Sequence, residues 1–130
     1  MRQWPSQTSL KLYASGVSIE KGDPSVQLDL FGGHGEVQVW NLLPQAAGPF
    51  TAVLSCTLSP GGSVGRHLQE HFPELVIGVE GEGEASIDGQ AARLAPGDVV
   101  YLPLGSVLAL KNRSNDAPLR YLIVKALNPS

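Results

Sequence analysis

Cysteine is almost absent from this sequence, since Cys56 is the only one among 130 residues. A single thiol excludes an intrachain disulfide and a zinc site built from cysteines. Such a chain is typical of a reducing compartment. We therefore expect a cytoplasmic protein in which Cys56 is a small buried apolar side chain.

Positive charge is also scarce. Nine Lys and Arg stand against twelve Asp and Glu, which gives a formal net charge of −3. The longest basic cluster is Lys111 with Arg113. A nucleic-acid-binding surface needs clustered Lys and Arg, so no nucleic-acid partner is expected.

Long apolar runs are missing as well. No stretch approaches the roughly 18–20 apolar residues of a membrane-spanning helix. Residues 1–6 lack the apolar run of a signal peptide. We therefore expect neither a membrane partner nor a secretory signal.

Glycine and proline, in contrast, are abundant, with 15 and 10 residues that stand between short apolar runs. No segment carries a sustained helical period, whereas many segments alternate apolar and polar residues as half-buried strands do. This pattern predicts an all-β sandwich or barrel. The predicted strands cover residues 26–30, 36–42, 50–58, 66–70, 74–79, 84–87, 91–94, 99–102, 107–111 and 119–127.

The length and the 42% of apolar residues suit one domain with one core. We assign this domain to residues 25–130. Residues 1–24 are an N-terminal extension, in which residues 10–13 have the pattern of a short strand.

Two spaced motifs carry the main functional signal. Their spacing is Gly61-x5-His67-x-Gln69-x4-Glu74-x6-Gly81 and Gly97-x5-Pro103-x-Gly105-x2-Leu108-x3-Asn112. Residues two apart in a strand share a face, so His67 and Gln69 point the same way. An imidazole and a carboxylate brought together inside a barrel are suitable ligands for a divalent metal.

Together the motifs resemble the two-part signature of the cupin superfamily over about residues 50 to 125. The resemblance implies a double-stranded β-helix (jelly-roll) cupin barrel with an N-terminal extension. Cupins typically hold a divalent metal through three histidines and one glutamate. His67 and Glu74 match two of these positions, but Gln69 and Leu108 stand where the family has histidines.

Because Gln69 and Leu108 replace two histidines, the sequence does not decide whether a metal is bound. Leu108 cannot bind a metal, so His67 and Glu74, with Gln69 or His71, would have to hold Fe, Mn, Ni or Zn. His71 shares the parity of His67, and a continued strand would direct it inward, whereas a turn before Pro73 would direct it outward. Alternatively, His67 and Glu74 hydrogen-bond each other in a metal-free pocket.

Two classes of function follow. In the first, the protein binds a small molecule in an apolar barrel, metal-free or weakly metal-binding, with Leu108, Tyr101 and Trp40 lining the pocket. The alternative for the two aromatic residues is an ordinary place in the core. In the second class, the protein is a metal-dependent enzyme of the dioxygenase or isomerase type that uses His67, Glu74 and Gln69 or His71.

Cupins commonly dimerise through an extension of this kind, so the resemblance also implies a homodimer. The extension carries Trp4, Leu10, Leu12 and Tyr13, which could pair with a neighbouring subunit. The substrate is not assigned by any residue of the sequence.

Overall fold

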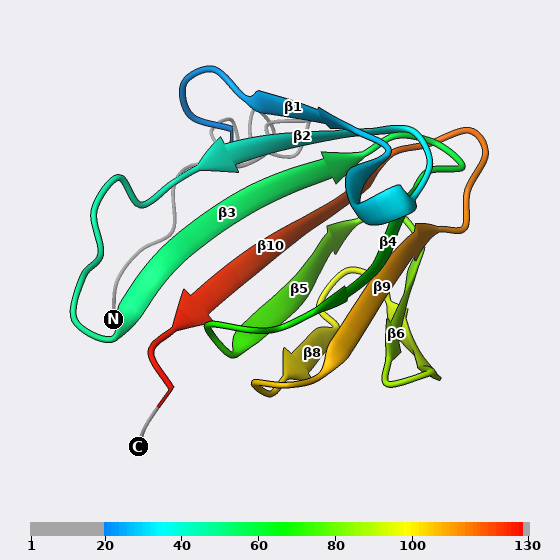
Figure 1. Ribbon diagram of the computed structural model, residues 1–130. Coiled ribbons are helices and arrows are strands. Elements are labelled where there is room, and N and C mark those ends of the chain that lie inside the picture. Colours follow the sequence, from blue (N-terminus) through cyan, green and yellow to red (C-terminus); the bar gives the residue numbers. More distant parts are fainter. Residues whose placement is uncertain (1–19, 129–130) are drawn as a thin grey trace, which may run out of the picture.

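The computed structural model describes residues 20–128 and shows ten strands in two antiparallel sheets (Figure 1). The six-stranded sheet has the order β1-β2-β3-β10-β5-β8, and the four-stranded sheet has the order β4-β9-β6-β7. The strands are β1 Ser25–Leu28, β2 Glu36–Asn41, β3 Phe50–Leu58, β4 Ser63–Leu68, β5 Glu74–Glu80, β6 Gly83–Ile87, β7 Gln90–Leu94, β8 Val99–Leu102, β9 Val107–Asn112 and β10 Leu119–Ala126. The predicted all-β fold is confirmed.

Most strand predictions agree with the structure to within two residues, and β3 and β8 agree at both ends. Two predictions need correction. The first strand ends at Leu28, because Asp29 and Phe31 adopt positive φ angles of 49° and 54°. The strand predicted for residues 66–70 lies at Ser63–Leu68 instead. The strand predicted for residues 10–13 lies outside the described residues.

The core lies between the two sheets and consists of the inward side chains of both. In β10, Leu119 and Tyr121 are buried, and Tyr121 stands opposite Cys56 of β3. In β9, Leu108 and Leu110 are buried. Alternation along β9 and the first half of β10 places every second side chain in the core.

A bulge in β4 changes this alternation. Val64 is paired with Leu110, and His67 is paired with Leu108, so β4 contains one residue more than β9 between these two pairs. A bulge of this kind re-aims the side chains that follow it. Val64 and His67 therefore both line the interior, although they are three residues apart.

A short 3-10 turn, η1 (Leu30–Gly32), lies against β4 (Figure 1). It is followed by His34, whose backbone exchanges hydrogen bonds of 3.0 and 2.7 Å with Ser63. A Cβ atom on Gly65 would collide with the carbonyl oxygen of Phe31, so only glycine lets the two backbones approach this closely. The contact fixes Phe31 beside β4.

Within residues 20–128, no helix has the length and apolar character needed to cross a membrane.

Candidate functional site

A cavity of about 610 Å³ lies between the two sheets. Its volume is in the range of small-molecule sites in proteins. Most of its lining is apolar. The walls are formed by Val37 and Val39 of β2, Leu54 of β3, Val64 of β4, Leu108 and Leu110 of β9, and Ile123 of β10.

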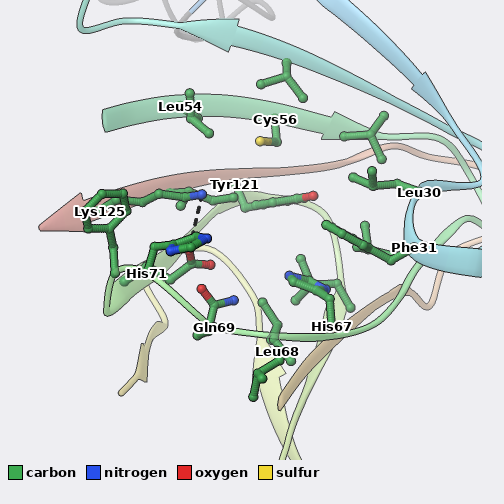
Figure 2. A pocket seen from close by; sticks show the side chains of 18 of the residues that line it. Leu30, Phe31, Leu54, Cys56, His67, Leu68, Gln69, His71, Tyr121 and Lys125 are labelled. Carbon is green, nitrogen blue, oxygen red and sulfur yellow. Dashed lines mark ion pairs between the residues drawn. The ribbon is translucent and has the colours of Figure 1, made fainter. Parts of the chain in front are cut away.

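The rim of the cavity contains exposed side chains from β4, from the segment that follows it and from η1. They are Phe31, Leu68, Glu70 and His71. Figure 2 shows Gln69, His71 and Lys125 at one end of the cavity, with His67, Phe31 and Leu30 at the other. The cavity therefore has a polar end, and most of its remaining lining is apolar.

Gln69, Glu74 and Lys125 form the polar end. Gln69 is only 7% exposed, and its backbone is held by Ser106 and Gly105 through hydrogen bonds of 2.9 and 2.8 Å. Glu74 is 4% exposed and stands opposite Lys125 on the neighbouring strand. The Lys125 Nζ lies 3.9 Å from Glu74 Oε2, which is too long for a direct hydrogen bond.

The burial of Glu74 raises its pKa above the ordinary value near 4.5, and the positive charge of Lys125 offsets this only in part. The folded protein therefore binds a proton at Glu74 more tightly than the unfolded chain does. Ionised Glu74 costs stability at neutral pH, and this cost disappears as the pH falls below about 4.5.

We therefore predict that Glu74→Gln stabilises the fold at pH 8 by about 1 kcal/mol, because it removes a buried charge and keeps the shape of the side chain. The gain should disappear near pH 4, because Glu74 of the unmodified protein is then protonated and as uncharged as the glutamine of the variant. Urea denaturation at both pH values measures the difference. Glu70→Gln, at an exposed position, is the control and should have little effect. A loss of stability at pH 8 would mean that the ion pair with Lys125 outweighs the burial of Glu74.

His67 makes two contacts that fix its ring. Its Nδ1 lies 2.9 Å from the carbonyl oxygen of Gly65, so Nδ1–H donates to that oxygen. The ring stacks on Phe31, with centroids 4.1 Å apart and an angle of 13° between the planes. The described residues show no hydrogen bond between His67 and Glu74, so the expected pairing of these two side chains is not found.

The donor set does not fit the metal that the cupin resemblance implies. Leu108 is 1% exposed and is the direct cross-strand neighbour of His67, so an apolar side chain fills the position of a third ligand. Among residues 20–128, no three His, Cys, Asp or Glu side chains are grouped closely enough to hold a metal ion. His67 and Glu74 alone are two ligands, fewer than the three or four of a zinc site.

The remaining predicted site residues divide into two groups. Leu108 lines the cavity, and His71 stands at its rim with a side chain that is 80% exposed. Tyr101 and Trp40 do not line the cavity. Tyr101 is 60% exposed, because it alternates with the buried Val100 and Leu102 of β8. Trp40 is buried, but it pairs with Ser55 on the opposite side of the sheet from Val39 and Cys56, which do line the cavity.

The structure adds cavity residues that the sequence analysis left out. Lys125 is the lone charged residue on the inner face of β10, after Tyr121 and Ile123, and alternation along that strand was the available signal. Phe31 lies in a segment without strand alternation, and nothing in the sequence pointed to it. Cys56 also lines the cavity. Burial raises the pKa of its thiol to about 12, so the thiol is protonated and poorly nucleophilic at neutral pH.

The two sheets and the cavity between them define a jelly-roll barrel of the cupin class. Comparison of the sequence with protein families gives the same answer, since residues 54–125 match the model of the cupin domain. The chain belongs to the cupin family. No protein of curated function matches the sequence significantly.

Solved structures agree with this assignment. The chain is similar to a predicted oxalate decarboxylase from Thermotoga maritima, with 30% identity, a TM-score of 0.75, and coverage of 82% of this chain and 93% of that one. It is also similar to the cupin domain of a transcriptional regulator from Enterobacter cloacae, with 25% identity, a TM-score of 0.63, and coverage of 72% and 98%. A cupin-like protein from Thermotoga maritima shares the fold at 22% identity, a TM-score of 0.70, and coverage of 86% and 85%.

Proposed function

We propose that this cupin binds a small, largely apolar molecule in its barrel and does so without a metal ion. The observation that carries the proposal is the cavity of about 610 Å³ whose interior is lined mainly by aliphatic side chains. Leu108 supports it further, because it occupies a position at which the cupin pattern has a metal ligand. A mostly apolar cavity with a few polar groups is the usual form of a small-molecule site.

The metal-dependent alternative, an enzyme with His67, Glu74 and Gln69 or His71 as ligands, has less support. The exposed side chain of His71 points to the rim, and Gln69 offers only a neutral amide. The similarity to a predicted oxalate decarboxylase does not make oxalate a suitable ligand for this cavity. Oxalate carries two carboxylates, whereas Lys125 is the one Lys or Arg among the described residues that line the cavity, beside Glu70 and Glu74.

Binding can be tested with the neutral fluorophore N-phenyl-1-naphthylamine. We predict that its fluorescence rises on titration with the protein and that dialysis against EDTA leaves the affinity unchanged. Metal analysis of protein purified without chelator should find less than a stoichiometric amount. Binding that disappears with EDTA and returns with a divalent metal would favour the metal-dependent alternative.

Two tryptophan substitutions on β10 locate the bound fluorophore. Ile123 lines the cavity, whereas the adjacent Leu122 does not. Ile123→Trp should fill the cavity and weaken binding at least tenfold, and Leu122→Trp should leave binding unchanged. Thermal unfolding checks that both variants are folded, because a larger side chain in a packed interior costs about 1–3 kcal/mol. Equal loss of binding in both variants would contradict a site inside the barrel.

A further inference from the structure

The polar end of the cavity has unused hydrogen-bonding capacity. Gln69 and Glu74 are both more than nine-tenths buried and both line the cavity. Within residues 20–128, neither side chain has a hydrogen-bonding partner, and the nearest cation to Glu74 is Lys125 at 3.9 Å. Their polar atoms remain accessible from the cavity, so they can hydrogen-bond a group that enters it.

We propose that the ligand carries an uncharged head group that both donates and accepts hydrogen bonds, such as a primary carboxamide, held by Gln69, Glu74 and Lys125. The inference rests on the proposed function and names the chemical class of its ligand. The apolar part of the ligand occupies the body of the cavity, between Leu54, Leu108 and Ile123.

The hydrogen-bonding roles of the three side chains define the head group. Ionised Glu74 only accepts, so the ligand must donate to it. The ammonium of Lys125 only donates, so the ligand must also accept. The amide of Gln69 both donates and accepts, so it can bond either the donor or the acceptor of the ligand. A group with a donor and an acceptor side by side satisfies all three.

The charge of the polar end favours an uncharged head. Glu74 and Lys125 carry opposite charges and already offset each other in a direct cross-strand pair. A charged head group would leave one net charge in a largely apolar enclosure, and burial of an uncompensated charge is costly. Of the other titratable side chains near this end, Glu70 and His71 are exposed at the rim and lie 3.8 Å from each other. Burial raises the pKa of the Cys56 thiol and of the Tyr121 hydroxyl, so both are uncharged at neutral pH.

Four compounds with one naphthalene body test the head group by displacement of N-phenyl-1-naphthylamine. Naphthalene-2-carboxamide is neutral and both donates and accepts, and methyl 2-naphthoate only accepts. The anion 2-naphthoate and the cation 2-naphthylmethylammonium complete the series. We expect the carboxamide to bind at least tenfold more tightly than each of the other three.

Two variants link this preference to the named residues. Gln69→Leu and Lys125→Met should each reduce the preference for the carboxamide over the ester, measured as the ratio of the two affinities on the same variant, to less than about threefold. Gln90→Leu and Lys111→Met make the same changes at exposed positions and should keep the full preference.

The outcomes separate the two proposals. If the fluorophore binds but the four compounds compete equally, or if either ion binds most tightly, the head-group inference is overturned and the proposed function stands. A preference that survives in Gln69→Leu and Lys125→Met also overturns the inference. If the fluorophore does not bind, or if its affinity is unchanged in Ile123→Trp, the proposed function is overturned and the inference with it.

Discussion

Replacement of Asn112 by leucine should destabilise the protein by about 3 kcal/mol, because it leaves several buried backbone groups without partners. Asn112 is 2% exposed and stands at the end of β9. Its Nδ2 donates to the carbonyl oxygens of Leu58, Ser59 and Ala117 at 3.3, 3.1 and 2.8 Å, and its Oδ1 accepts from the backbone N–H of Ser114 at 3.0 Å. One side chain therefore joins the end of β3 in one sheet to β9 in the other and to the loop before β10.

Urea denaturation of Asn112→Leu and of the matched control Asn115→Leu measures the effect. Asn115 lies in the same loop and is exposed, so its replacement should change the free energy of unfolding by less than about 0.5 kcal/mol. Thermal unfolding should show a decrease of roughly 10 °C for Asn112→Leu alone. Similar stability of the two variants would mean that the buried bonds of Asn112 contribute little to the fold.

Asn112 belongs to the motif residues from which the fold could be predicted. The spaced glycines, Pro103 and Asn112 act locally, through permitted backbone angles and short-range hydrogen bonds, and such constraints are visible in a linear pattern. Gly61, Gly81, Gly97 and Gly105 all adopt positive φ angles between 68° and 92°. The alternation of apolar and polar residues then defined most of the strands.

The cavity could be predicted less completely, because its residues depend on events between strands. The bulge before His67 reverses the alternation of β4, and only the register with β9 reveals it. Phe31 reaches His67 through a turn with a positive φ angle that a phenylalanine rarely adopts, so its side chain could not be placed from the pattern. Tyr101 was assigned inward because it is aromatic, although the alternation of β8 directs it to the surface.

We expect the apolar residue at position 108 to keep a metal ion out of this barrel. We predict that Leu108→His destabilises the metal-free protein by about 3 kcal/mol, since it buries an unpartnered imidazole at a site that is 1% exposed. Position 108 is the cross-strand neighbour of His67, and side chains so paired have Cβ atoms about 4.5–5.5 Å apart. Two imidazoles on neighbouring strands give Ni²⁺ or Zn²⁺ two suitable ligands, and water molecules complete the coordination.

Metal binding should therefore restore the stability that Leu108→His loses. At a free metal concentration of about 1,000 times the dissociation constant, binding to the folded state contributes roughly 4 kcal/mol, so the melting temperature of Leu108→His should rise by 10 °C or more between EDTA and excess Ni²⁺. Leu110→His is the matched control. It buries the same imidazole on the same strand, but its cross-strand neighbour is Val64, so it should lose stability and gain nothing from metal. The unmodified protein should show no metal-dependent shift, because Gln69 and Leu108 stand where the cupin pattern has two of its four ligands. A shift in the unmodified protein comparable to that of Leu108→His would contradict metal-free binding and restore the metal-dependent alternative.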